Sequence, residues 1–266
     1  MMGRPIVFMT DYGLADEFVG ICHGVMARIA PATRVIDLTH AIPRQDVVAG
    51  AMALGRAAPF MPEDAVYLGV VDPGVGSARR PVAVACGSGA LLVGPDNGVL
   101  SMAWAALGGA AQAAEITSER VLLGPVSATF HGRDVFAPAA AHLSIGMPLP
   151  DLGPPVDPRT LHTVEMPAPM ILRGVVGARV IGVDGYGNVQ LNARSRDLEV
   201  AGLERSVEVC GRVVSRASTF ADVSEGSPAA IVDSQGFVAL IVNGGSAAEA
   251  LGLHRGDAVT LSRPGG

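Results

Sequence analysis

The sequence is poor in aromatic residues and in charge, and it lacks the cysteine spacing of a disulfide framework or a zinc knuckle. Aromatic residues make up 4% of its 266 positions and charged residues 17%. Cys22, Cys86 and Cys210 are far apart in the sequence, which favours buried thiols in a reducing compartment. No apolar run reaches membrane-spanning length, and the first predicted strand begins without a leader segment. We therefore expect a cytoplasmic protein with no membrane partner.

Excess positive charge and several well-known ligand-binding motifs are absent too. The formal net charge is −6 and no basic stripe runs along the chain, so we expect no nucleic-acid partner. The sequence contains no G-x-G-x-x-G, P-loop, nucleophile elbow, C-x-x-C or H-E-x-x-H motif. These absences argue against dinucleotide, nucleoside-triphosphate and zinc-protease chemistry, and we predict a protein without a cofactor.

Short apolar runs alternate with stretches of helical periodicity over the first 150 residues. This alternation predicts a Rossmann-like α/β domain, 1–150, with a mostly parallel sheet. We expect strands at 5–9, 34–38 and 65–71, a hairpin of 81–86 with 91–93, and helices at 16–29, 46–57, 98–107 and 134–145. Proline-rich residues 151–170 predict a linker. Short apolar runs between glycines predict a small antiparallel β-barrel domain over 171–266.

Polar residues follow the predicted strands of the first domain where each strand ends. The apolar run 65–71 leads directly into Asp72, and a Pro/Gly-rich turn then brings Arg79. Asp11 follows the first strand, and His131 precedes a predicted helix. Because ligands of open α/β sheets bind at the carboxyl ends of the strands, we expect these four side chains to converge on one site.

A glycine-rich motif, 184–192, stands out in the second domain. Its glycines would let the backbone approach a ligand closely, and Asn188 offers both a donor and an acceptor, which suits a nucleobase edge. Tight β-turn chemistry explains the same residues equally well. Similar Asn-, Ser- and Gly-rich turns recur at 234–237 and 243–246.

Metal binding is a less well supported interpretation of these polar residues than a ligand site at the strand ends. Asp11, Asp37, His40 and His131 are suitable ligand types, but their spacing is not diagnostic of a metal site, and we predict none. Asp37 is as readily explained by bracing a loop. We expect structural or surface positions for the remaining histidines, which are His23, His142, His162 and His254.

Ordered blocks of residues over nearly the whole chain carry a resemblance to a known family. The blocks are Thr10–Gly13 with Asp16 and Gly20, Ile36–His40, Val71–Gly76 with Arg79, Gly94–Gly98, Phe130–Asp134, Asp184 with Tyr186–Asn188, and Ser234–Asn243. In these blocks the chain resembles the S-adenosyl-L-methionine (SAM) hydroxide adenosyltransferases, or SAM hydrolases, which are relatives of fluorinating and chlorinating enzymes.

The resemblance implies a homotrimer whose active sites lie between the first domain of one subunit and the second domain of its neighbour. It implies a catalytic set of Asp72, Arg79 and His131. It also implies substrate contacts: Asp11 on the ribose diol, Asp184 and Ser234 on the methionine or adenine portion, Asn188 on the adenine edge, and backbone near Val242 and Asn243 at the adenine slot.

The implied reaction is hydrolysis of SAM to adenosine and L-methionine by water activated to attack ribose C5′. The alternatives are a SAM-dependent halogenase, a non-catalytic SAM or adenosine binder, and a metal-dependent phosphoesterase. Three departures from the wider family matter. His131-Gly132 replaces the Tyr-Ser pair of the halogenases, the short 87–89 connection leaves no room for the fluorinating enzyme's insertion, and Ala239 replaces an acid near the adenine.

Overall fold

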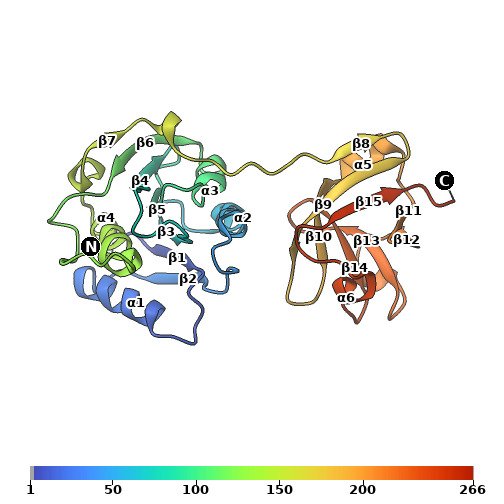
Figure 1. Ribbon diagram of the computed structural model, residues 1–266, viewed down its shortest axis with the longest axis horizontal. Helices are drawn as coiled ribbons and strands as arrows, with labels where there is room; N and C mark the ends of the chain where they lie inside the picture. The colour runs from blue at the N-terminus through green and yellow to red at the C-terminus, as the bar shows by residue number, and fades with distance from the viewer. Residues whose placement is uncertain (1–2, 266) are drawn as a thin grey trace. The chain divides into compact units, whose positions relative to one another are not determined.

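The computed structural model describes residues 3–265 and divides the chain into two compact units, with the boundary between Val164 and Glu165. Figure 1 labels the elements of each unit. Among the described residues, every helix is too short or too polar to cross a lipid bilayer.

The first unit is built on a seven-stranded sheet of order β2-β1-β3-β5-β4-β6-β7. Its strands are β1 (Ile6–Thr10), β2 (Val35–Thr39), β3 (Val66–Val70), β4 (Pro81–Cys86), β5 (Leu91–Pro95), β6 (Ala110–Glu115) and β7 (Pro155–Val156). The pairs β1–β2, β1–β3 and β3–β5 are parallel, whereas β4 is antiparallel to both β5 and β6. The predicted mostly parallel α/β sheet and the predicted hairpin are therefore present.

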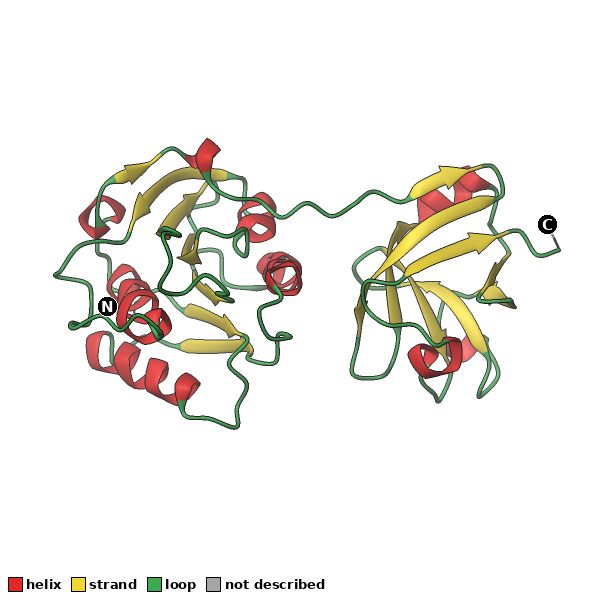
Figure 2. Ribbon diagram, viewed as in Figure 1, coloured by secondary structure: helices red, strands yellow, loops and turns green. Residues whose placement is uncertain are grey.

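Helices cover both faces of this sheet (Figure 2). Helices α1 (Phe18–Ile29) and α4 (Ala137–Ser144) share a core with Ile6 and Phe8, and α2 (Val47–Ala57) and α3 (Ser101–Ala106) share one with Val7 and Met9. Alternate residues of β1 thus face opposite layers, as the period of two in a strand requires. A short 3₁₀ turn, η1 (Ala58–Phe60), follows α2.

The predicted linker, 151–170, is wrong in its first half. The 3₁₀ turn η3 (Leu149–Leu152), strand β7 and the 3₁₀ turn η4 (Pro158–Thr160) all belong to the first unit. Prolines suit these positions because 3₁₀ first turns and edge strands do not require their missing N–H. The many prolines of this segment therefore indicate short ordered elements rather than a free linker.

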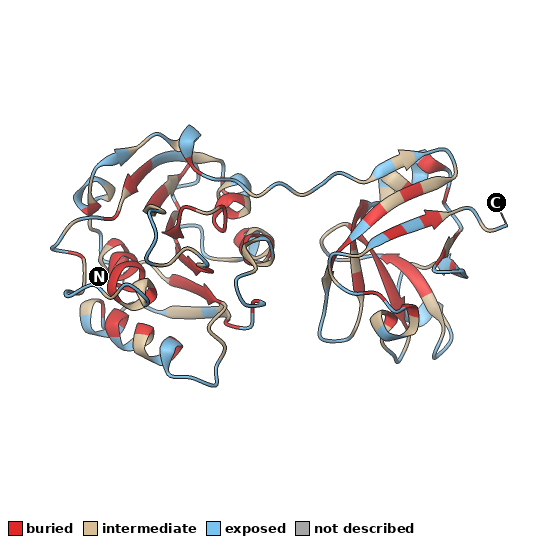
Figure 3. Ribbon diagram, viewed as in Figure 1, coloured by how far each residue is buried: buried red, intermediate tan, exposed pale blue. Residues whose placement is uncertain are grey.

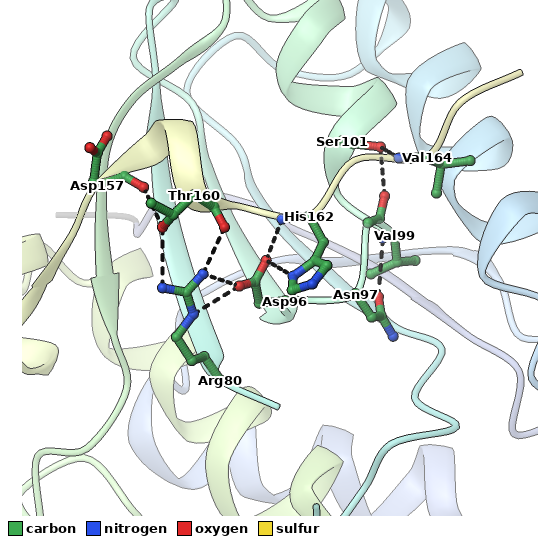
Figure 4. A network of polar contacts seen from close by, with 10 residues as sticks. Arg80, Asp96, Asn97, Val99, Ser101, Asp157, Thr160, His162 and Val164 are labelled. Carbon is green, nitrogen blue, oxygen red and sulfur yellow. Dashed lines mark hydrogen bonds and ion pairs between the residues drawn. The ribbon is translucent and has the colours of Figure 1, made fainter. Parts of the chain in front are cut away.

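Residues 157–164 are fastened to the first unit by a polar network (Figure 4). Arg80 donates from Nε to Asp96 Oδ2 (2.9 Å) and from Nη2 to the Thr160 carbonyl (2.9 Å). Asp96, whose side chain is 2% exposed, also accepts from the His162 backbone N–H at 2.8 Å. The Val164 N–H donates to Ser101 Oγ at 3.1 Å. These contacts hold the chain in place up to the unit boundary.

The second unit is a closed β-barrel, because β10 pairs with β9 as well as with β14. Its elements are β8 (Met170–Leu172), β9 (Val175–Val183), β10 (Val189–Arg194), α5 (Ser195–Ala201), β11 (Ser206–Val209), β12 (Arg212–Arg216), η5 (Phe220–Asp222), β13 (Pro228–Val232), β14 (Phe237–Val242), α6 (Ala247–Leu251) and β15 (Ala258–Ser262). Buried residues lie along its strands (Figure 3).

Two details of the barrel differ from the prediction. The β12–β13 pairing is parallel, so the barrel is not purely antiparallel. Helix α5 was not foreseen; the Arg194 backbone N–H donates to the Asp197 carboxylate at 2.7 Å, which caps this short helix. The barrel class itself is as predicted.

Candidate active site

The turn after β3 places a carboxylate and a guanidinium side by side. Arg79 Nε donates to both oxygens of Asp72, at 2.9 and 3.0 Å, and Nη2 makes a further bond to Oδ2. Both side chains are almost buried, with 6% of Asp72 and 9% of Arg79 exposed. Gly76 has a φ of +76°, and an added Cβ would lie 2.5 Å from the Ala128 carbonyl oxygen. Only glycine fits this turn without displacing the neighbouring loop.

A single π-helical turn, η2 (Gly132–Phe136), begins directly after His131. Such turns are frequent at functional sites. Buried Asp134 anchors the turn by accepting from the Ser127 backbone N–H at 2.8 Å and from Arg133 Nε at 2.6 Å. Burial alone would raise the pKa of Asp134, but these hydrogen bonds lower it below the ordinary value. The loop before His131 is therefore held by an ionised carboxylate.

The two segments meet because Arg79 Nη2 lies 2.8 Å from His131 Nδ1. A guanidinium has donors and no acceptor, so Nδ1 must be the accepting nitrogen of the ring. In neutral His131 the proton consequently resides on Nε2. The structure thus links Asp72, Arg79 and His131 in one hydrogen-bonded row, as the strand-end argument predicted.

Burial and the neighbouring charge of Arg79 lower the pKa of His131 below its ordinary value of 6.5, against smaller opposing effects of Asp72 and Asp134. His131 is therefore neutral at pH 7. The Arg79 guanidinium carbon also lies 5.0 Å from the ring centre of Phe136, which is fully buried. This ring screens the cation from water on one side and keeps its field strong.

A cavity of about 210 Å³ opens beside this row. Its lining residues are Asp11, Tyr12, Phe18, Asp72, Val75, Thr129, Phe130, His131 and Gly132. Asp11 Oδ2 accepts from the Gln45 backbone N–H at 2.7 Å, which fixes the carboxylate at the cavity wall. Three of the four residues predicted to converge line the cavity, and the fourth, Arg79, is hydrogen-bonded to two of them, Asp72 and His131.

The aromatic wall of the cavity was missed by the sequence analysis. Tyr12, Phe18 and Phe130 contact one another edge to face, with ring centres 5.2 to 6.0 Å apart. Burial raises the pKa of Tyr12 well above its ordinary value, so the side chain is a neutral phenol. An added Cβ on Gly132 would lie 2.1 Å from Tyr12 Oη. The signal for Tyr12 was its place next to Asp11.

The glycine-rich motif of the second unit forms the turn between β9 and β10. Asp184 Oδ1 accepts from the backbone N–H groups of Tyr186 and Asn188, each at 2.9 Å, and Oδ2 accepts from Asn188 Nδ2 at 2.8 Å. Gly187, with a φ of +80°, leaves room for Ser246. Both oxygens of Asp184 therefore organise the turn itself.

Asn188 and Val242 line a cavity of about 460 Å³ with Tyr186, Phe220, Gly244 and Gly245. Asn243 follows Val242, and its Nδ2 donates to the Val223 carbonyl at 2.8 Å. Exposed Ser234 is not among the residues lining this cavity. It precedes β14, whereas Val242 ends that strand, so the two are separated by roughly 17 Å at about 3.3 Å per residue.

The four metal-ligand candidates do not form one set. Asp11 and His131 line the cavity of the first unit. Asp37 and His40 instead meet His23, a residue that the sequence analysis left as structural. Ala239, which the resemblance places where an acid is expected near the adenine, is 4% exposed and packs with Ile231 and Ile241.

The chain is similar to known proteins over nearly its whole length. Residues 6–153 match the SAM hydroxide adenosyltransferase N-terminal domain, and residues 178–260 match the C-terminal domain of the same name. The chain is 53% identical to an (R)-S-adenosyl-L-methionine hydrolase of Salinispora tropica over 97% of both chains. It is 44% identical to one of Thermus thermophilus over 97% of this chain and 99% of the relative.

More distant similarity reaches a fluorinase of Actinoplanes, at 29% identity over 98% of both chains. Among solved structures, an uncharacterized conserved protein of Thermotoga maritima superposes with a TM-score of 0.88 at 34% identity, covering 97% of this chain and 100% of that one. A conserved hypothetical protein of Thermus thermophilus gives a TM-score of 0.76 at 41% identity, over 97% and 99% of the chains.

Proposed function

The chain belongs to the SAM hydroxide adenosyltransferase family, and from this premise we propose that it hydrolyses SAM to adenosine and L-methionine. The observation that best supports this function is the hydrogen-bonded row of Asp72, Arg79 and His131 beside an aromatic-walled cavity. The similarity to curated SAM hydrolases at 44% and 53% identity points the same way.

The reaction is a displacement at ribose C5′. A bond forms from the water oxygen to C5′ as the bond from C5′ to the sulfonium sulfur breaks, and the electron pair of that bond remains on sulfur. Methionine therefore leaves as a neutral thioether without help from an acid, and the attacking water releases one proton. The chemical difficulty is to obtain hydroxide character in water near neutral pH.

Arg79 and His131 together would stabilise hydroxide character in the attacking water. The guanidinium cannot lose its proton, so it supplies a fixed positive field that favours hydroxide over water. Neutral His131 donates from Nε2 to the attacking oxygen while Nδ1 accepts from Arg79. Asp72 holds Arg79 in orientation through its paired hydrogen bonds. This assignment makes His131 a donor to the nucleophile, and the released proton passes to solvent.

The cavity wall suits the rest of the substrate. Asp11 would accept hydrogen bonds from the ribose diol, because its carboxylate is held at the wall by Gln45. The rings of Tyr12, Phe18 and Phe130 offer aromatic surface that attracts a sulfonium cation. These contacts would align C5′ with the water, and alignment of reacting groups is worth several kcal/mol.

The second unit would supply the remaining substrate contacts. We place the adenine edge at Asn188 with backbone near Val242 and Asn243, because Asn188 and Val242 share a cavity. Asp184 and Ser234 remain predicted contacts of the methionine or adenine portion; Asp184 would act through the turn that it organises. A homotrimer with sites at subunit interfaces belongs to the same proposal, and its test is the native mass.

A halogenase is the alternative that the cavity disfavours. The resemblance places a serine of the halogenases at the position of Gly132, and a Cβ there would lie 2.1 Å from Tyr12 Oη. Fluorinase similarity is also lower, at 29% identity, than hydrolase similarity. The chain therefore uses water as its nucleophile.

The deciding experiment incubates purified protein with SAM, excess chloride and EDTA, and separates the products by chromatography. Adenosine and methionine in equal amounts, without 5′-chloro-5′-deoxyadenosine, are the expected products. Chlorinated product would favour the halogenase, and activity lost in EDTA would favour a metal-dependent enzyme. Bound SAM that stays intact for hours would favour the non-catalytic binder.

An Arg79→Ala variant should be inactive in the same assay. Arg159→Ala, which alters an 89% exposed arginine, serves as the matched control.

A further inference from the structure

Three side chains of types that can bind a metal ion meet on the first unit, outside the cavity described above. His23 Nε2 lies 2.9 Å from Asp37 Oδ1, and His40 Nε2 lies 3.2 Å from the same oxygen. One ligand atom from each residue lies within 4.8 Å of the other two. None of the three residues lines the cavity beside Asp72.

An unsatisfied atom points into this cluster. His40 is 4% exposed, and its Nε2 is a buried nitrogen without a hydrogen-bond partner among residues 3–265, since its 3.2 Å approach to Asp37 lacks hydrogen-bond geometry. Its other ring nitrogen, Nδ1, lies 2.9 Å from Thr10 Oγ1. With the Nδ1 proton donated to Thr10, Nε2 presents its lone pair to the cluster. A buried nitrogen of this kind is costly unless something binds it.

The cluster is built by the sheet and by packing. Phe8 of β1 stands in register with Asp37 of β2. The Phe8 ring, fully buried, meets the His23 ring at 5.7 Å and the His40 ring at 4.7 Å, both edge to face. Helix α1 brings His23 over the same face. Both imidazoles are thus held in place by a buried ring, so little order would have to be gained on binding a ligand.

We propose that His23, Asp37 and His40 form a site for one divalent transition-metal ion, with zinc the expected occupant. Two imidazole nitrogens and one carboxylate oxygen suit zinc, which binds such atoms at about 2.0–2.2 Å. Ligand atoms around a tetrahedral ion at that distance lie roughly 3.3 Å apart, close to the 2.9 and 3.2 Å found here. Water completes the fourth position, since the side chains of His23 and Asp37 are 34% and 46% exposed.

The contact of His40 with Thr10 is the arrangement expected around a bound metal. Histidine ligands generally donate their second ring N–H to a nearby oxygen, which fixes the tautomer. The His40 carbonyl also accepts from the Gly13 N–H at 2.7 Å. A metal here would tie α1 to β2 and brace the turn that carries Asp11. It takes no part in the proposed hydrolysis, and sequence reasoning, which predicted no metal, left His23 out.

Calorimetric titration of EDTA-treated, desalted protein with ZnCl₂ at pH 7.5 tests the site, with metal content measured by mass spectrometry. We expect one zinc ion per chain, bound at micromolar affinity or tighter. His23→Gln and Asp37→Asn should each weaken binding at least about tenfold, the usual order for a lost ligand or its support. His254→Gln is the matched control, because that histidine is 86% exposed, and His131→Ala excludes the cavity as the binding place.

Thermal unfolding gives a second readout that does not depend on activity. Zinc at 100 times its Kd should raise the Tm of the first unit by about 5–10 °C, and this rise should vanish in His23→Gln. Partly exposed His23 is the variant least able to disturb folding, and its Tm without zinc checks this. Absence of zinc binding, or binding and Tm shifts unchanged by both variants, would show that the cluster is a hydrogen-bonded carboxylate clamp only.

Discussion

The role of His131 can be divided between its two ring nitrogens. Arg79 occupies Nδ1 at 2.8 Å, so the ring has only an Nε2–H to offer the attacking water. His131→Ala removes that donor from a partly buried site. Loss of one preorganised donor to a developing oxyanion lowers kcat by about 10²–10³-fold, or roughly 3–4 kcal/mol. We expect a loss of this size, with SAM affinity changed by less than about tenfold.

Two further substitutions separate a donor from a general base. His131→Gln can place an amide N–H where Nε2 lies, whereas His131→Asn can only replace the Nδ1 acceptor used by Arg79. If the Nε2–H acts as donor, the glutamine variant should recover at least about tenfold in kcat over alanine, and the asparagine variant should not. A base has to take up a proton, which neither amide can do.

The assay is chromatographic release of adenosine at saturating SAM, with SAM affinity measured separately by calorimetry. His254→Ala, at a residue with an 86% exposed side chain, is the matched control. Equal kcat for glutamine and alanine, at unchanged SAM affinity, would reject the donor role. Turnover by His131→Ala close to that of the unaltered protein would reject any part for this ring in the reaction.

Three other outcomes follow from the same cavity. Because burial and Arg79 lower the pKa of His131 below 6.5, kcat/KM should hold steady above pH 6.5 and fall below it, where a proton on Nδ1 would face the guanidinium. As the pH is lowered, a decline in kcat/KM that already begins above pH 7 would contradict this. Asp11→Ala should raise KM for SAM about 10–100-fold, the worth of one or two charge-assisted hydrogen bonds, and an unchanged KM would remove its role on the ribose. Gly132→Ser should lower the free energy of unfolding by about 1–3 kcal/mol. In a double-mutant thermal unfolding cycle, Tyr12→Phe should relieve most of that cost, since the next ring atoms lie 3.1 Å or more from the added Cβ. Independent effects of the two substitutions would show that the added side chain does not collide with Tyr12 Oη.

Most of the candidate site could be predicted from the sequence because its residues follow the ends of predicted strands. Asp72 follows a continuous apolar run, and the Pro/Gly turn after it returns Arg79 to the same sheet edge. Parallel neighbours present their carboxyl ends together, which also places Asp11. His131 arrived from a distant segment, and only its residue type and flanking turn signalled it.

What the sequence could not predict depends on tertiary packing. Tyr12 and Phe130 look like ordinary core residues, and their place at the cavity wall follows from how α1 and the loop before η2 fold together. His23 lies 14 residues from Asp37, and no periodicity within one segment reveals that α1 covers β2 there. The separation of Ser234 from Val242 likewise appears only once the length of β14 is known.

Two consecutive arginines at the turn after β3 bind different partners. Arg79 bonds to Asp72 and His131, whereas Arg80 bonds to Asp96 and Thr160. A fragment ending at residue 150 would therefore lose the contact of Arg80 with Thr160, directly beside Arg79 in the sequence, and would leave Asp96 without the backbone N–H of His162. The boundary between the two units lies after Val164, so the proline-rich residues 151–164 belong to the unit that carries the candidate active site.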